Sequence, residues 1–179
     1  MTDRRPTADD RDGSHKAQDR PIDAATARRY VASQVGLFLL ALGHAMLTWP
    51  LGDTLALFAG GIAVAFVVEA PAISVGLFTH YLRPKVAGVP VSILLAWPAV
   101  VYIAVRVASL VVDGPLAVAA LAAVLGTLAD AVAEPGAVED GAWAYSTMIP
   151  GPRVRGVPWW NATGWLGVVF VTALLPTLV

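Results

Sequence analysis

Long apolar runs, separated by short polar or Pro/Gly-rich segments, make up most of the chain after residue 29. A helix that crosses a membrane needs ~20 mostly apolar residues. Five runs approach this length, and they cover 30–49, 54–69, 89–112, 115–134 and 159–179. The stretch 71–88 is too short and too broken for another span, and 136–158 is a loop rich in Gly and Pro. The pattern predicts an all-α, polytopic membrane bundle of about five transmembrane helices.

Prolines suggest where several of these helices begin and end. Pro115 suits the first turn of a helix, where its missing N–H costs nothing, and Pro90 is expected to open the third span. Pro135 is expected to end the fourth span, because the residue before a proline tends to leave the helical region. Glu69 is likewise expected to end the second span, just before Pro71. No internal repeat is apparent.

Charge divides the chain into two regions. Residues 1–29 hold 13 of the 25 charged side chains, so 30–179 hold only 12. The first region has too few large apolar residues to offset chain entropy and is predicted to be a disordered polar tail. The second, 30–179, is the predicted transmembrane domain. Because soluble domains have about 25 % charged residues, an ordinary cytosolic enzyme is excluded, and so is a nucleic-acid binder. The absence of Cys excludes a secreted disulfide scaffold.

The positive residues predict an orientation. If the tail is cytoplasmic, eleven of the twelve Lys and Arg residues lie on the inner side, and only Arg106 lies within a span. The short outer loops contain Asp53 and Asp113 and no positive residue. Inner loops of membrane proteins carry this excess of Lys and Arg. We therefore expect a multi-pass protein of the cell membrane with a cytoplasmic N-terminus.

Three carboxylates and an amide gather at one end of the predicted bundle. Glu69, Asp130 and Glu134 fall at the cytoplasmic ends of the second and fourth spans, and Asn161 falls at the start of the fifth. Ionisable groups in a span cost ~2.5–3.5 kcal/mol and are functional candidates by default. Asp130 and Glu134 are four residues apart and share a helix face. The alternative interpretation is that these groups simply end helices near water.

Known cofactor and metal motifs do not explain this cluster. Asp130 and Glu134 resemble half of a carboxylate site for a hard cation. The chain has no DDxxD motif, no phosphate-binding GxxxxGK[ST] loop, and neither an HExxH nor a GxSxG motif. The sequence therefore predicts neither a metal nor a cofactor.

One spaced pattern of residues resembles a known family. The pattern comprises Glu69, Gly76-Leu-Phe, Tyr81, Pro84, Gly88-Val-Pro90, Trp97, Asp130-Ala-Val-Ala-Glu134-Pro135, Trp143, Gly156-Val-Pro158, Asn161 and Gly164-Trp165. It resembles the membrane carotenoid-biosynthesis family that includes carotenoid hydratases, among them the bisanhydrobacterioruberin hydratase of haloarchaea. The resemblance covers about 60–170, and its most specific part is the second half.

This resemblance implies a lyase of the hydro-lyase type in an archaeal-type pigment pathway. The reaction would hydrate a terminal isoprenoid double bond of an acyclic carotenoid to a tertiary alcohol. Such an alkene must be protonated by an acid, and a carboxyl group in an apolar site can hold that proton at neutral pH. A second carboxylate can deprotonate the water. Asp130 or Glu134 is the candidate acid with Glu69 as its partner, and the order stays open.

Further residues are candidates for binding the substrate. Trp143, Trp160 and Trp165 can stabilise the tertiary cation through their π faces, although packing or interfacial roles are equally compatible with their positions. Asn161 can place the water, and the inner-loop residues His80 and Tyr81 complete the predicted set. A lone His in a loop is often merely solvated.

The expected partners are the acyclic carotenoid, the lipid bilayer and other membrane enzymes of the same pathway, with no nucleic acid. Two alternatives stay open. A non-catalytic relative would bind carotenoid or scaffold the pathway. A carotenoid cyclase would protonate the same double bond and then lose a proton instead of adding water.

Overall fold

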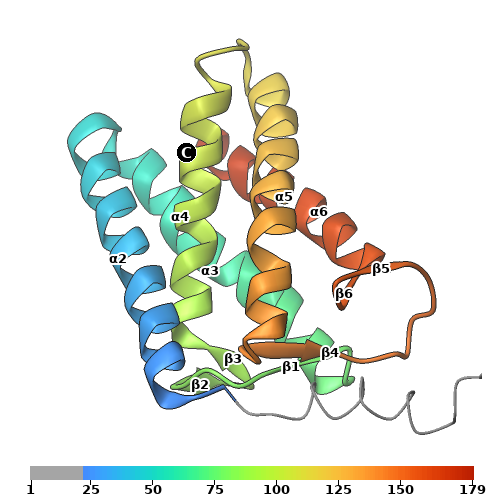
Figure 1. Cartoon of the computed structure of the whole chain (residues 1–179). Helices are drawn as coiled ribbons and strands as arrows, with labels where there is room; N and C mark the ends of the chain where they lie inside the picture. The colour runs from blue at the N-terminus through green and yellow to red at the C-terminus, as the bar shows by residue number, and fades with distance from the viewer. Residues whose placement is uncertain (1–21) are drawn as a thin grey trace, which may run out of the picture.

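The structure, a computed structural model, describes residues 22–179 and consists mainly of five long helices (Figure 1). They are α2 (Ala24–Thr48), α3 (Leu51–Ser74), α4 (Val91–Ala108), α5 (Pro115–Glu139) and α6 (Trp159–Leu174), which the 3₁₀ turn η2 (Leu175–Leu178) extends. Within 22–179, these five are long and apolar enough to cross a membrane. Each corresponds to one predicted span. The chain is an all-α, polytopic helical bundle, as predicted.

Six short strands connect the helices. They are β1 (Phe78–His80), β2 (Lys85–Val86), β3 (Val89–Pro90), β4 (Trp143–Tyr145), β5 (Arg153–Val154) and β6 (Val157–Pro158). They form three antiparallel pairs, β1–β4, β2–β3 and β5–β6. The pair β1–β4 lies at the end of the bundle where α3 and α5 finish, drawn at the bottom of Figure 1. We call this end the strand end.

The first helix begins earlier than the predicted span. Its start at Ala24, rather than Tyr30, follows from Asp23, whose carboxylate accepts hydrogen bonds from the backbone N–H of Ala25 at 2.9 Å and Thr26 at 3.1 Å. These bonds satisfy free N–H groups of the first turn. Hydrogen bonding to Thr26 and Ala25 lowers the pKa of Asp23. Residues 1–21 of the predicted tail lie outside the described residues.

Two prolines do not end their helices where the sequence predicts. Pro71 and Pro135 lie inside α3 and α5, which continue to Ser74 and Glu139, so the predicted ends at Glu69 and Glu134 are wrong. A proline in a helix loses its own backbone donor, but the turns beyond it can keep theirs. The N–H of Val75 indeed reaches the carbonyl of Pro71 at 3.0 Å. Both glutamates therefore lie inside helices.

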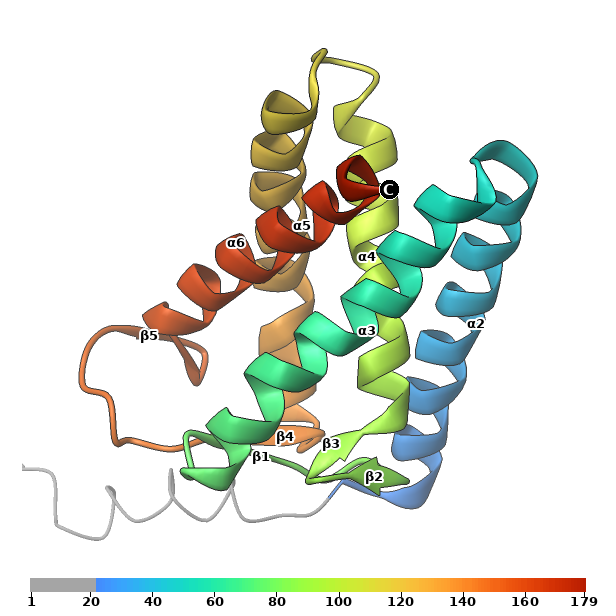
Figure 2. The ribbon, with the colours of Figure 1, turned by 180° about the vertical axis from the view of Figure 1, so that it is seen from behind.

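The chain contains two structural repeats, which the sequence pattern alone did not reveal. The first repeat is α3–β1–β2–β3–α4 (51–108) and the second is α5–β4–β5–β6–α6 (115–174). In each, the first helix runs toward the strand end and the second runs back (Figure 2). The repeats therefore run in parallel, as they do where an axis along the membrane normal relates two halves of a membrane protein.

Equivalent positions can be counted along the chain. Glu134 follows Glu69 by 65 residues, and β4 follows β1 by the same interval. The hairpins match after a shift of 68 residues, with Lys-Val-Ala-Gly-Val-Pro at 85–90 and Arg-Val-Arg-Gly-Val-Pro at 153–158. Their turns share a backbone conformation, with φ of 47° and 85° at Ala87 and Gly88 and 49° and 87° at Arg155 and Gly156.

The strand pair β1–β4 obeys this symmetry. Thr79 lies opposite Ala144, its own equivalent. On either side, Tyr81 N–H donates to Ala142 O at 2.8 Å, and Ser146 N–H donates to Leu77 O at 2.9 Å. Because these two bonds are exchanged by the 65-residue shift, a pseudo-twofold axis passes between Thr79 and Ala144. The residues that β1 and β4 carry inward therefore come from both repeats.

Small residues allow the helices of the two repeats to approach closely. Gly61 and Gly126 are equivalent, and a Cβ at Gly61 would lie 3.0 Å from both Pro98 Cβ and Thr172 Cγ2. A Cβ at Gly126 would lie 3.1 Å from a methyl of Val169. Helix association in membranes depends on such close packing. The helices thereby meet around a shared interior.

Candidate functional site

A cavity of about 550 Å³ lies near the strand end, and all five helices contribute to its wall together with β1 and β4. Most of the lining side chains are aliphatic or aromatic. Three carboxyl groups also line it, those of Glu69, Asp130 and Glu134, and all three residues are buried. Buried carboxyl groups are uncommon unless they are paired or functional.

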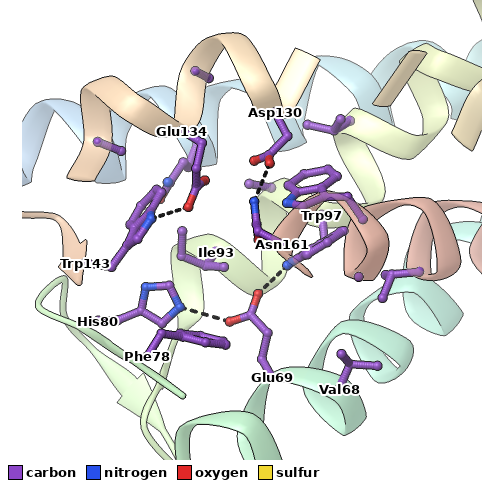
Figure 3. A pocket seen from close by; sticks show the side chains of 18 of the residues that line it. Val68, Glu69, Phe78, His80, Ile93, Trp97, Asp130, Glu134, Trp143 and Asn161 are labelled. Carbon is purple, nitrogen blue, oxygen red and sulfur yellow. Dashed lines mark hydrogen bonds and ion pairs between the residues drawn. The ribbon is translucent and has the colours of Figure 1, made fainter. Parts of the chain in front are cut away.

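The first repeat holds Glu69 through two ring nitrogens. Trp97 Nε1, from α4, donates to Glu69 Oε1 at 2.5 Å. His80 Nε2, from β1, lies 3.1 Å from Glu69 Oε2 (Figure 3). Since His80 and Glu69 are both buried, this bond ties β1 to α3 within the wall of the cavity.

The second repeat holds Glu134 in a related way, but both of its partners come from β4. Trp143 Nε1 donates to Glu134 Oε1 at 2.5 Å (Figure 3), and the Tyr145 hydroxyl donates to the same oxygen. Tyr145 follows Glu134 by eleven residues, as His80 follows Glu69. Burial, reinforced by the Glu134 carboxylate, raises the pKa of Tyr145 well above its ordinary value, so its hydroxyl remains a donor.

Asp130 and Asn161 are additions that only the second repeat carries. Asn161 Nδ2 donates to Asp130 Oδ2 at 2.7 Å, and Asn161 Oδ1 lies 3.0 Å from the Tyr145 hydroxyl, whose single hydrogen points to Glu134 or to Asn161. A continuous set of polar contacts therefore joins Asp130 through Asn161 and Tyr145 to Glu134. Ala65 and Ile93 occupy the positions equivalent to Asp130 and Asn161.

Indole rings form much of the remaining wall. Trp97 and Trp165 are equivalent residues of the two repeats, and they stack with ring centroids 4.0 Å apart and planes inclined by 24°. Trp160 stacks with Phe78 at 6.4 Å. The faces of such rings carry negative potential and attract cations. The cavity therefore combines proton donors and acceptors with surfaces that can stabilise a carbocation.

Three buried polar atoms in this wall have no hydrogen-bond partner within the described residues. They are Gln34 Oε1, His80 Nδ1 and Trp160 Nε1, and all three residues line the cavity. Buried polar atoms normally have a partner, which can be an ordered water. These atoms can bind a water molecule or a polar group of a ligand.

The cavity brings together the predicted site residues with one exception. Asp130, Glu134, Glu69, Asn161 and the remaining predicted residues His80, Trp143, Trp160 and Trp165 line it. Tyr81 does not, and its side chain is 38 % exposed. Neighbouring side chains in an extended segment point to opposite sides, so the inward position of His80 turns Tyr81 away. Tyr81 therefore lies outside the cavity wall, and a role for it in substrate binding stays a prediction.

Sequence reasoning missed several residues of the cavity. Tyr145 and Gln34 were not predicted, and Trp97 entered only as part of the family pattern. The spacing of eleven residues from Glu69 to His80 and from Glu134 to Tyr145 is a signal that could have found Tyr145. Gln34 has no such signal, because α2 lies outside both repeats. Within 22–179, no cluster of three or more His, Asp or Glu residues is placed to hold a metal ion.

Comparison with known proteins agrees with the sequence pattern. No curated protein and no solved structure was found to match. A family model described as carotenoid biosynthesis protein, however, matches residues 31–179, which include all five helices apart from the first turns of α2. The chain is a membrane protein by its helices, and its cavity suits an apolar ligand. It belongs to the carotenoid biosynthesis protein family.

Proposed function

We propose that the protein hydrates a terminal double bond of an acyclic carotenoid to a tertiary alcohol. The observation that carries this proposal is the burial of three carboxyl groups in one apolar, indole-lined cavity. Membership of the carotenoid biosynthesis family supports a polyene substrate. The reaction adds one water across one C=C bond and needs no redox change.

Asp130 is the proposed acid. Glu134 Oε1 accepts two hydrogen bonds, and each oxygen of Glu69 has its own nitrogen partner. Each glutamate is thus held by two partners. Asp130 has one donor, Asn161, and lies beside the carboxyl group of Glu134. It is therefore the carboxyl group best suited to hold a proton and deliver it to the less substituted alkene carbon.

Other residues of the cavity wall then stabilise the cation and orient and deprotonate the water. Proton transfer leaves a positive charge on the tertiary carbon, which the stacked Trp97 and Trp165 faces stabilise. A water oxygen bonds to that carbon, and Glu69 accepts the proton that the water loses. Gln34 Oε1 and Trp160 Nε1 are the unpartnered atoms available to orient this water. Glu69 then releases that proton to solvent, and a proton from solvent restores Asp130.

The proposed orientation places the cavity near the cytoplasmic face of the cell membrane. Arg83, Lys85, Arg153 and Arg155 belong to the loops and hairpins after α3 and α5, while Arg106 lies in the last turn of α4. The absence of Cys allows single-cysteine labelling. In intact cells, an impermeant maleimide should label Leu110→Cys, in the opposite loop, and should not label Val154→Cys. The reverse pattern would contradict this orientation.

The proposed reaction is tested by expressing the protein in cells that accumulate an acyclic carotenoid. The molecular masses of the extracted pigments are then measured by mass spectrometry. Hydration adds the mass of one water per end group. Asp130→Asn should remove this product, whereas Asp113→Asn, in the loop at the opposite end, should keep it. An isomer of unchanged mass would indicate a cyclase. Pigment bound to the purified protein without chemical change would indicate a carotenoid-binding or scaffolding protein.

A further inference from the structure

A second cavity, of about 230 Å³, lies between α4 and α5 and adjoins the first. Val100 and Ala129 belong to the walls of both cavities. The other lining residues are Ile103, Ala104, Val107, Leu125 and Gly126, none of which carries a polar side chain. We call this second cavity the α4–α5 groove. The groove is apolar and adjoins the first cavity, which contains Glu69, Asp130 and Glu134 and which we call the carboxylate cavity.

The groove leads away from the strand end. It follows α4 from Val100 to Val107, a distance of about 10 Å at the helical rise of 1.5 Å per residue. In Figure 1, α4 and α5 run side by side toward their connecting loop at the far end of the bundle. Asp130 immediately follows Ala129, where the two cavities meet. The groove therefore begins beside the proposed acid and extends toward the opposite membrane face.

The equivalent seam of the pseudo-symmetric fold is filled. The pseudo-symmetry relates α5 to α3 and α4 to α6. The seam between α4 and α5 is therefore equivalent to the seam between α3 and α6. There, η2 brings Leu175 against α3, and a Cβ at Gly60 would lie only 2.5 Å from Leu175 Cδ1. At the α4–α5 seam, the side chains of Ala104 and Ala129 are too small to fill the space. The two seams are thus built differently.

We propose that the α4–α5 groove binds the long apolar chain of the polyene whose end group occupies the carboxylate cavity. The identity of that end group rests on the proposed function. Three observations select this occupant: the groove shares Val100 and Ala129 with the wall of the first cavity, it offers only apolar contacts, and its lining residues follow α4 and α5. A conjugated chain is rigid and extended, so it needs a straight path that starts at the reacting end.

A matched pair of substitutions tests the groove. Val107 lines it and is 45 % exposed, whereas Val124, on α5, does not line it and is 46 % exposed. Val107→Phe fills the groove without touching a carboxyl group. We expect it to reduce conversion of a long acyclic carotenoid by ~10-fold, which corresponds to ~1.4 kcal/mol of steric conflict. Val107→Phe should leave the conversion of a short acyclic isoprenoid with the same end group unchanged. Val124→Phe should behave as the unaltered protein with both substrates.

Binding supplies a readout that does not depend on hydration. The purified protein in lipid nanodiscs is mixed with the long carotenoid, and the absorption and induced circular dichroism of bound pigment are recorded. The unaltered protein, Val124→Phe and Asp130→Asn should bind it, and Val107→Phe should bind ~10-fold more weakly. Binding with this pattern but without any hydrated product would support the groove and refute only the proposed reaction.

Three results would overturn the proposal that the groove binds the polyene chain. Equal binding by Val107→Phe and Val124→Phe would show that the chain lies elsewhere. Equal loss of the long and the short substrate in Val107→Phe would show that the substitution acts on the carboxylate cavity. An acyl lipid that copurifies with the unaltered protein and that the carotenoid does not displace would assign the groove to the bilayer lipid.

Discussion

The two repeats share a backbone and differ in what they place inside it. In the first, Glu69 is held by Trp97 and His80, and in the second, Glu134 is held by Trp143 and Tyr145. His80 and Tyr145 are equivalent residues on the paired strands β1 and β4. This shared feature ties each strand to its helix and closes the strand end of the cavity.

The difference lies one helical turn deeper, where the second repeat has Asp130 and Asn161 in place of Ala65 and Ile93. These two residues extend the hydrogen bonds of Glu134 into the apolar part of the cavity. The comparison therefore separates a glutamate that both repeats bond to a strand from a carboxyl group, Asp130, that the second repeat alone carries.

The largest expected effect is the loss of activity in Asp130→Asn. The substitution keeps the size of the side chain but removes the transferable proton, and acid catalysis contributes about 10²–10⁴-fold to a rate. Product formation should fall by at least about 10²-fold, while the thermal unfolding temperature in detergent should change little. Full activity in this variant would show that the difference between the repeats is not catalytic.

The converse substitution, Ala65→Asp, gives the first repeat its own buried carboxyl group. Ala65 is fully buried, so the new group lacks a partner and should cost ~2.5–3.5 kcal/mol. Ile93→Asn at the position equivalent to Asn161 should recover part of this loss in the double variant. Thermal unfolding of both single variants and the double variant measures the coupling. Strictly additive losses would contradict the equivalence of the two sites.

A smaller effect is expected for Tyr145→Phe, which removes the hydroxyl that contacts Glu134 and Asn161. A hydrogen bond to a charged group contributes ~1.5–3 kcal/mol. Because burial raises the pKa of Tyr145 in the folded state, this stabilisation is complete below about pH 10 and decreases as the pH rises further, where the unfolded tyrosine ionises. Unfolding measured at pH 8 and pH 11 should show a smaller difference between the variant and the unaltered protein at pH 11.

The smallest effect concerns the hairpin turns, where the repeats are alike. Ala87 and Arg155 adopt positive φ beside a glycine. An L-residue there is strained by ~1–2 kcal/mol, and Asn tolerates this conformation better. Ala87→Asn should therefore stabilise the protein by less than about 1 kcal/mol. Arg155→Asn should gain less, since it also loses the exposed contact with Glu139. Thermal unfolding of both variants measures the difference, and a marked loss at Ala87 would contradict the shared turn.

Parts of the site could be foreseen from sequence because they depend on local rules. Glu69, Asp130 and Glu134 stand out since charged residues are rare in apolar runs, and the alternation of spans places all three at one end. Tyr145 could not be separated from a solvated loop residue in this way. Its place in the cavity depends on the pairing of β4 with β1, whose residues are 65 positions away in the chain.

The sequence by itself determined the membrane class, the helix type and the number of spans. A long apolar segment in a bilayer must satisfy its backbone groups internally, and a helix does this without help from the rest of the chain. Only the tertiary structure decided that α3 and α5 continue past Pro71 and Pro135 and that Tyr81 faces outward. The structure also showed that the matching segments 85–90 and 153–158 belong to two whole repeats. It also decided that the α4–α5 seam stays open. These features depend on contacts between distant segments, which hydropathy and spacing along one chain do not encode.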